Sequence, residues 1–217
     1  MGVEKYIDAE RPDDFTKTVL KTINACYQEV TITKVTGECP FGLREGERFN
    51  VTSMNHDGIC GSLYQAIHPY IGSCHYGAEA PWEKKSGRWS SVCPEMGKVQ
   101  VEVQRAAKED IKVFKTRIKP RSMTGKGFPS LDKYRVFVEI LGVERHCTWA
   151  HKAGDRFEVD SFNIGDLCGN LYWGAYRFIN LLLGEGGLPW EGDKNFIHSM
   201  CPDVFNQTSY RLIKEER

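Results

Sequence analysis

The sequence lacks an excess of charge of either sign. Among its 217 residues, 29 Lys and Arg balance 29 Asp and Glu, so the formal net charge at pH 7 is zero. A strongly basic protein that binds nucleic acid is therefore excluded, and no nucleic acid partner is expected. One local stretch, residues 108–133, holds eight Lys or Arg against three Asp or Glu, and a solvated connector explains it better than a binding patch.

Long apolar runs and a secretion signal are also missing. No run approaches the ~20 residues that a membrane helix needs, and the first residues, Met-Gly-Val-Glu-Lys, do not begin the apolar core of a signal peptide. We therefore expect a cytoplasmic protein with no membrane partner. Disulfides rarely persist in that reducing compartment, so the eight cysteines call for another explanation, which is metal binding, reactivity or burial.

Familiar catalytic motifs are absent as well. The chain has no Walker phosphate loop, no GxGxxG after a strand and no pattern typical of a Ser-His-Asp triad. It has no CxxC pair, which is the strong signature of a zinc knuckle or an iron–sulfur cluster. The sequence therefore names no substrate, and whether the protein is an enzyme stays open.

What the sequence does contain is an internal duplication. Residues 30–95 align without a gap on residues 138–203, an offset of 108 positions, and roughly a third of the aligned residues are identical. Chance does not align three cysteines and two Pro-Trp pairs in this way, so the chain is a tandem duplication of one unit. The matched cysteines are Cys39 with Cys147, Cys60 with Cys168, and Cys93 with Cys201.

Hydrophobic periodicity predicts the same element order in both copies. Two alternating stretches predict strands, a stretch with helical spacing predicts a helix, and a final alternating stretch predicts a last strand. The predicted fold class is α+β, with two pseudo-symmetric ββαβ repeats, each a small, mainly antiparallel sheet with a packed helix. Pro69 is expected to kink or shorten the first helix. The predicted strands are 30–35, 48–53 and 99–104, then 136–143, 156–161 and 208–213, and the helices begin at Cys60 and Cys168.

Two segments lie outside the repeats. An amphipathic pattern that ends at Cys26 predicts an N-terminal helix. The connector between the repeats is basic, and its residues 111–118 alternate enough to form a strand. The predicted organisation is an N-terminal helix in 1–27, repeat 1 in 28–106, a basic connector in 107–133 and repeat 2 in 134–217.

Two cysteines, Cys26 and Cys74, have no counterpart in the other copy. Each lies on the apolar face of a predicted helix, and free cysteine packs as a small hydrophobic residue. We therefore expect both to be structural.

The three matched cysteines of each copy lie where distant side chains can converge. One follows the first strand, one opens the helix and one precedes the last strand. Three thiolates that meet form a soft-metal site, either a [4Fe–4S] cluster with one non-cysteine iron or zinc with water or an acid as fourth ligand. A reactive thiol favoured by the helix dipole and plain burial remain alternatives. The candidate metal ligands are Cys39, Cys60, Cys93, Cys147, Cys168 and Cys201.

Two matched acids and two matched arginines are candidates for catalysis at such a site. Glu95 and Asp203 each follow the third cysteine by two residues and would serve as ligand, acid or base. Arg48 and Arg156 would clamp an anionic substrate through the planar guanidinium. Pairing of these arginines with Glu95 or Asp203 inside the unit is the favoured alternative.

Matched aromatic residues are candidates for ligand binding. Tyr64 and Tyr172 lie one turn beyond the helix-opening cysteine, so their hydroxyls are expected to reach the same site. Trp82 and Trp190 follow prolines in glycine-bearing loops. They would wall a ligand pocket or fill the core, and the core is favoured.

These landmarks, in this order, resemble a group of short prokaryotic proteins of unknown function that are roughly one repeat long. The shared features are a Cys-Pro after the first strand, a Gly-Asp-x-Phe turn, a cysteine, a Pro-Trp-Glu loop and a late Cys-Pro-Asp. The chain departs from that pattern where Gly61 and Gly169 follow the helix-opening cysteines instead of proline, and where Thr148 follows Cys147. The resemblance implies a duplicated member of this group and implies no activity.

Two functions from different classes follow. The first is a two-repeat protein with a cysteine-ligated metal or iron–sulfur site, which would support Lewis-acid hydration or dehydration, or redox chemistry, on a small anionic substrate. An iron–sulfur cluster is the expected cofactor, with zinc as the alternative. The second is a non-catalytic binding or assembly module in which the cysteines are buried and structural.

Overall fold

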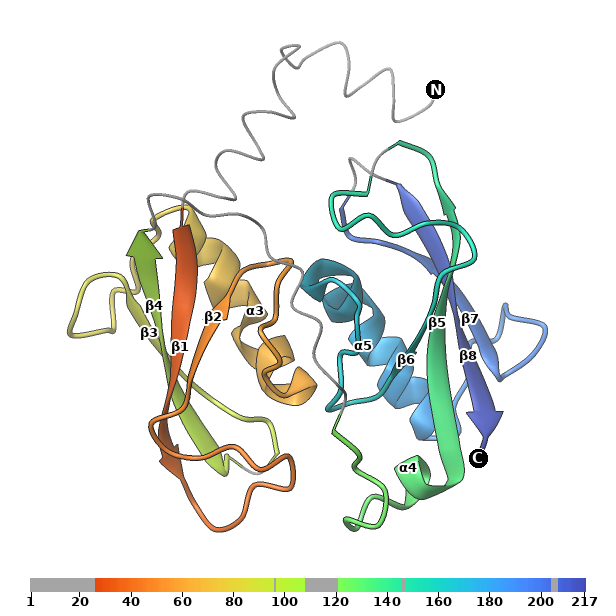
Figure 1. The fold of residues 1–217 in the computed structure, drawn as a ribbon, viewed down its shortest axis with the longest axis horizontal. Coiled ribbons are helices and arrows are strands. Elements are labelled where there is room, and N and C mark those ends of the chain that lie inside the picture. Colours follow the sequence, from red (N-terminus) through yellow and green to blue (C-terminus); the bar gives the residue numbers. More distant parts are fainter. Residues whose placement is uncertain (1–25, 96, 108–120, 146, 204–206) are drawn as a thin grey trace.

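The structure is a computed structural model that describes residues 26–95, 97–107, 121–145, 147–203 and 207–217. It contains two four-stranded antiparallel sheets, each packed against one long helix, so the predicted α+β class is confirmed (Figure 1). The first half consists of β1 (Cys26–Val35), β2 (Arg48–Val51), α3 (Gly61–His75), β3 (Arg88–Val92) and β4 (Val99–Ala107). The second consists of α4 (Pro129–Lys133), β5 (Tyr134–Val143), β6 (Arg156–Val159), α5 (Gly169–Leu183), β7 (Phe196–Met200) and β8 (Thr208–Glu216).

The two halves share one topology. Their strand orders are β2-β1-β4-β3 and β6-β5-β8-β7, and every neighbouring pair is antiparallel. The Cys93 N–H donates to Val99 O, and the Cys201 N–H donates to Thr208 O. The two donors are 108 residues apart and the two acceptors 109, so the second half carries one additional residue between Cys201 and Thr208.

The structure differs from the sequence-based prediction in three places. Each unit is ββαββ, because β3 and β7 were not predicted; each is an edge strand of five residues in which a single side chain, Trp89 or Ile197, is buried. The first strand begins at Cys26, so this residue belongs to β1 and not to a helix. Pro69 does not shorten α3, which has the same 15 residues as α5. The helix predicted before residue 26 and the strand predicted in 111–118 lie outside the described residues.

Each core lies between the inner face of a sheet and one helix. In β1, alternate residues face inward, and Val30 and Ile32 are buried at 0% and 1% exposure. Leu63 and Ile67 of α3, both at 0% exposure, belong to the same core. Full burial of such side chains stabilises a fold by about 1.5–3 kcal/mol each, so this packing fixes the start of the helix relative to the sheet. No helix in the described part of the chain is both long and apolar enough to cross a membrane.

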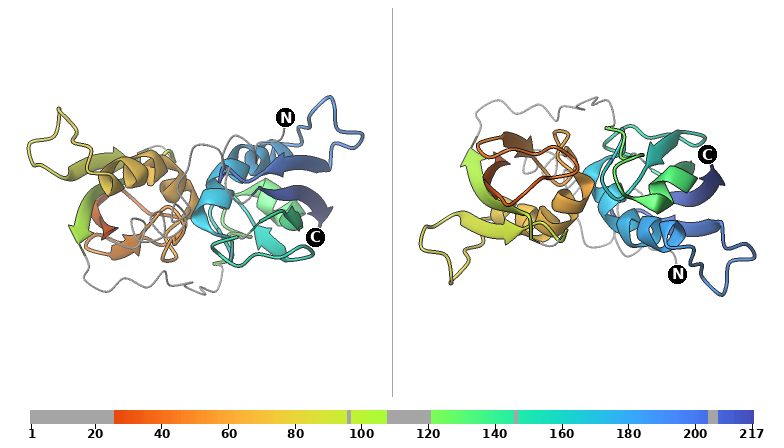
Figure 2. Two further views of the ribbon diagram at one scale, coloured as in Figure 1. Left: turned by 90° about the horizontal axis from the view of Figure 1, so that it is seen from above. Right: turned by 90° about the horizontal axis from the view of Figure 1, so that it is seen from below.

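The helices α3 and α5 lie between the two sheets, and the halves meet around the first turns of these helices (Figures 1 and 2). The Gly61 N–H donates to Phe162 O at 2.6 Å, and the Gly169 N–H donates to Met54 O at 2.7 Å. Gly61 and Gly169 are equivalent in the repeat, as are Met54 and Phe162. The two halves are therefore joined by a pseudo-two-fold exchange of main-chain hydrogen bonds.

Glycine is required at both junction positions. A Cβ on Gly61 would overlap the Tyr172 hydroxyl, and a Cβ on Gly169 would overlap the Tyr64 hydroxyl. Proline would also lack the N–H that each glycine donates to the other half. Neither alanine nor proline is therefore compatible with the contact between the halves at these positions.

Candidate functional site

The matched cysteines of the second half border one small cavity. Cys147 follows β5, Cys168 is the N-cap of α5 and Cys201 follows β7. Together with Asp203 and Met54 they line a space of about 10 Å³. A cavity of this size holds about one water molecule.

The matched cysteines of the first half also come together. Cys60 is the N-cap of α3, and the negative charges of Cys93 and Cys39 both raise the pKa of its thiol. The charge of Cys39 likewise raises the pKa of Cys93. All eight cysteines lie in the described ranges and are free thiols, so the clusters are not held by disulfides. Cys39 and Cys201 are partly exposed, which gives each cluster a side open to solvent.

Burial favours the neutral thiol at Cys60, Cys93, Cys168 and Cys201, because it raises the pKa of each. Burial raises the pKa of Cys60 to about 12, and the N–H groups of Leu63 and Ser62 lower it only in part. Burial also raises the pKa of Cys201 to about 12 and that of Cys168 well above its ordinary value. The rise at Cys60 disfavours the thiolate by about 4 kcal/mol, whereas a helix end contributes about 0.3–1 kcal/mol. At Cys60, burial therefore outweighs the effect of the helix end on the thiol.

The thiols do not yet stand at ligand geometry. Among the residues that the structure describes, no three Cys, His, Asp or Glu side chains are arranged as a ready-made metal site. Binding of an ion by these clusters would therefore require the thiols to rearrange from their positions in this structure. Such adjustment is common where metal binding and local ordering are coupled.

The matched acids lie beside the thiols. Asp203 borders the second-half cavity, and its charge raises the pKa of both Cys168 and Cys201. The charge of Glu95 raises the pKa of Cys93, while the Glu95 N–H lowers it. Both acids are therefore placed where they can accept a proton released by a thiol or contribute an oxygen ligand.

The matched tyrosines are buried at the junction, where each hydroxyl lies against the glycine of the other half and hydrogen-bonds within its own half. Tyr64 and Tyr172 are fully buried, and their hydroxyls donate to Thr52 O at 2.8 Å and Asp160 O at 2.9 Å. The charge of Cys168 raises the pKa of Tyr64, and that of Cys60 contributes to the raised pKa of Tyr172, although burial is the main cause in both. The prediction that each hydroxyl serves the cluster of its own half is wrong, because the first turns of the two helices meet.

The matched arginines lie on the exposed faces of the sheets. Arg48 pairs with Glu29 at 3.5 Å, and Arg156 pairs with Glu215 at 2.6 Å while its guanidinium lies 4.0 Å from the centre of the Phe137 ring. Structural ion pairing is therefore observed, but with partners inside the sheets and not with the predicted acids. Neither arginine borders the second-half thiol cavity.

The matched tryptophans are exposed. Trp82 is 70% and Trp190 is 77% exposed, so the prediction that they fill the core is wrong. They lie on the loops between α3 and β3 and between α5 and β7, which project from opposite ends of the molecule (Figure 2). The core position expected for Trp82 is taken by Trp89 on β3, against whose ring Trp82 packs edge-on at 5.8 Å. Cys26 and Cys74 are buried as expected, at 1% exposure each.

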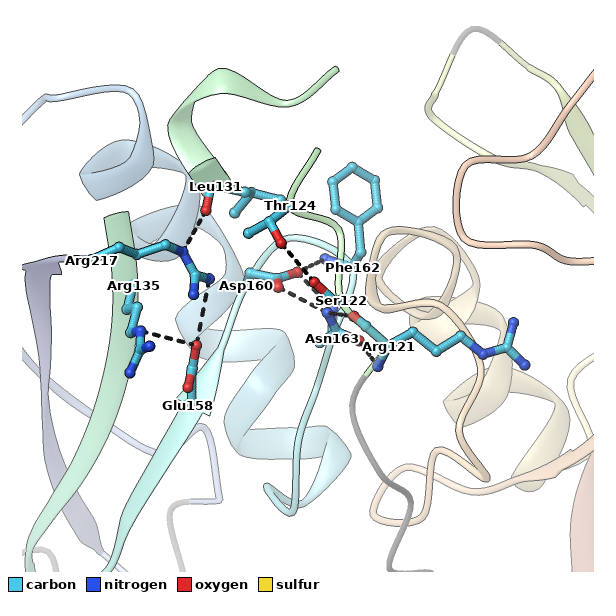
Figure 3. Close-up of polar contacts among 10 residues, drawn as sticks. All are labelled: Arg121, Ser122, Thr124, Leu131, Arg135, Glu158, Asp160, Phe162, Asn163 and Arg217. Carbon is cyan, nitrogen blue, oxygen red and sulfur yellow. Dashed lines mark hydrogen bonds and ion pairs between the residues drawn. The ribbon is translucent and has the colours of Figure 1, made fainter. Parts of the chain in front are cut away.

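A larger cavity of about 250 Å³ lies where the connector reaches the second half. Its polar residues already have structural partners (Figure 3). Asp160 accepts the N–H groups of Phe162 and Asn163, Asn163 accepts the Arg121 N–H, and Arg217 donates to Leu131 O. Because these groups hold turns and the connector, the cavity is a structural junction. Sequence reasoning missed it because Arg121, Leu131 and Arg217 lie outside the aligned repeats.

Sequence reasoning also missed Met54 at the thiol cavity. Met54 belongs to the first half, yet it borders the cysteines of the second half and is only 6% exposed. Its counterpart is Phe162, so a search for matched residues passes over it. The two glycines after the helix-opening cysteines were the one sequence signal that pointed to this junction.

No family model, no curated protein and no solved structure matches this chain. The resemblance to short prokaryotic proteins therefore stays a prediction.

Proposed function

We propose that the protein binds soft metal ions, one in each half, through its matched cysteines. The observation that carries this proposal is the small cavity bordered by Cys147, Cys168 and Cys201, three thiols from separate elements with an acid, Asp203, beside them. The clustering of Cys39, Cys60 and Cys93 in the first half supports it independently. Thiolates are soft ligands, and zinc or copper(I) accepts them readily.

The size of the cavity favours a single ion and favours binding over catalysis. A space of about 10 Å³ accepts one ion, whereas an iron–sulfur cluster or a metal-bound substrate needs more room. The arginines that would hold an anionic substrate lie on the outer faces of the sheets. We therefore place zinc or copper ahead of an iron–sulfur cluster, and metal binding ahead of hydration, dehydration or redox chemistry.

Burial of the thiols is compatible with this proposal. A lone thiolate in this environment is unfavourable, but a cation that replaces the proton neutralises the charge where solvent cannot. Each thiol that becomes a ligand releases one proton to solvent, and Asp203 or Glu95 is placed to assist. Metal uptake is thus coupled to proton release, as expected for thiolate sites.

The test is metal stoichiometry. Untagged protein is purified without oxygen, reduced, stripped of metal and titrated with Zn(II); we expect two ions for each wild-type chain. Cys60→Ser and Cys168→Ser should each leave one, because each removes a ligand from one half. Cys74→Ser, a buried cysteine outside both clusters, is the matched control and should leave two. A wild-type chain that binds no ion under these conditions overturns the proposal. A brown product that absorbs near ~400 nm would instead indicate an iron–sulfur cluster.

A second candidate function rests on the exposed tryptophans. Trp82 and Trp190 are exposed in equivalent loops, each anchored by a glutamate: Glu83 accepts the Ser90 N–H and Glu191 accepts the His198 N–H, both at 2.7 Å. A large aromatic side chain held outward in both copies favours a binding or assembly module. Sedimentation of the wild type against the double variant Trp82→Ala, Trp190→Ala tests whether the loops mediate self-association.

A further inference from the structure

We infer that Met54 of the first half is a fourth sulfur donor to the thiol site of the second half, and that this site therefore selects copper(I). The inference rests on the proposed function and names the metal. It also makes the second-half site a product of both halves, because one of its donors comes from the other side of the junction.

The position of Met54 is fixed from both sides. Its carbonyl accepts the Gly169 N–H at 2.7 Å, so it is attached directly to the residue after the helix-opening Cys168. Its own N–H donates to Thr52 Oγ1 at 3.2 Å. It is 6% exposed and borders the same cavity as Cys147 and Cys201.

The donor set determines the metal. Three thiols and a thioether form a soft donor set, in which the thioether favours copper(I), whereas zinc is bound by thiolate, imidazole or carboxylate. The site binds copper supplied as copper(I), so no electron is transferred, and each thiol that coordinates releases its proton to solvent. Asp203 remains beside the cavity as the oxygen donor that zinc would use.

The first half lacks this donor. The residue equivalent to Met54 is Phe162, which likewise accepts the hydrogen bond from the opposite glycine, at 2.6 Å, but has no donor atom in its side chain. The two thiol sites are therefore unlike. The second half should take copper(I) more tightly than the first, while zinc should distinguish between them less.

The experiment measures copper(I) affinity at the second site alone. The Cys60→Ser background disables the first site, and copper(I) is titrated without oxygen against a competing copper(I) chelator. Met54→Leu keeps the size of the side chain and removes the sulfur; we expect copper(I) affinity to fall on the order of 10-fold with zinc affinity unchanged. Met123→Leu is the matched control, a 2% exposed methionine outside the thiol cavity, and should change neither affinity.

The outcomes separate the two proposals. If copper(I) and zinc bind and Met54→Leu equals its parent in both affinities, the role of Met54 is overturned and the proposed function stands. If neither metal binds, both fail. Met54→Phe introduces the residue of the other half and provides a second variant without sulfur in case leucine disturbs packing. Sulfur coordination measured by X-ray absorption on the copper-loaded protein should fall by one atom in both variants.

Discussion

The two halves share their landmarks but differ in what lies between them. Both keep three clustered thiols, a glycine at the junction and a buried tyrosine that reaches across. The helix α3, however, carries His68, Cys74 and His75 where α5 carries Tyr176, Leu182 and Leu183. The first half therefore has a titratable, polarisable helix face and the second an apolar one.

This difference separates shared properties from acquired ones. The matched cysteines, glycines and tyrosines lie at the thiol clusters and at the junction, whereas the matched arginines and tryptophans are exposed. Unmatched residues lie on the helices and at Met54, and they make the halves chemically unlike. His68, for example, stacks on Trp173 of the other half, with ring centres 4.9 Å apart. Tyr176, the residue equivalent to His68, does not repeat this contact.

Breaking the shared junction should have the largest effect on stability. In Gly169→Ala the new methyl group would overlap the Tyr64 hydroxyl and lie 2.8 Å from Ser53 O, which is main chain and cannot move aside. We expect a loss of about 3 kcal/mol in the free energy of unfolding, at the upper end for overpacking. Urea unfolding followed by circular dichroism measures it.

Gly72 supplies the control for that prediction. It lies inside α3, its φ is ordinary, and apart from its chain neighbours and the backbone of its own helix no heavy atom lies within 4 Å of the point where an alanine methyl group would stand. Gly72→Ala should stabilise the protein by about 0.5–1 kcal/mol through helix propensity. Equal effects of the two substitutions would mean that the halves do not depend on the close approach at Gly169.

His68, on the titratable face of α3, should contribute to the loss of folding stability at acid pH. Burial lowers the pKa of His68 to about 4, against the opposing effects of Asn170 and the Ser53 carbonyl; its ring neighbours are Tyr64 and Trp173. The unfolded chain, with a pKa near 6.5, binds the proton first, so stability is full above about pH 6.5 and is lost as pH falls toward 4. The pKa shift limits this loss in the free energy of unfolding to about 3 kcal/mol, and because the ring is partly exposed we expect about 2 kcal/mol.

His68→Tyr tests that assignment by introducing the residue of the second half. The variant has no imidazole at this position, so its stability should fall less between pH 6.5 and pH 4 than that of the wild type. Urea unfolding at several pH values gives the comparison. An unchanged acid limb in His68→Tyr would assign it to other groups, of which His56, with a pKa lowered by burial to about 4, is the first.

Much of the fold was predictable because the same sequence pattern occurs in both repeats. The matched cysteines, the strand bounds near Arg48 and Arg156 and the two helix starts all follow from periodicity that repeats at the same offset. The edge strands β3 and β7 were not predictable, because one buried residue in five leaves no alternating pattern.

The site was predictable only within one repeat. That Cys39, Cys60 and Cys93 come together follows from their places at the ends of elements. That Tyr64 reaches the other half, and that Met54 borders the other half's thiols, depends on how two units pack, which periodicity within a unit does not contain. The glycines after the helix-opening cysteines were the exception, since both copies carry glycine at the position where the halves meet.

The smallest effect is expected at an unmatched cysteine. Cys74 is 1% exposed on α3, and burial raises the pKa of its thiol to about 12, so it is a neutral, packed side chain. Cys74→Ala removes one buried sulfur and should cost about 1 kcal/mol in the free energy of unfolding, comparable to the loss of a buried methylene group. The number of metal ions for each chain should not change. Loss of an ion on this substitution, measured by metal analysis beside Cys60→Ala, would show that the thiol site of the first half extends to residues that the second half lacks.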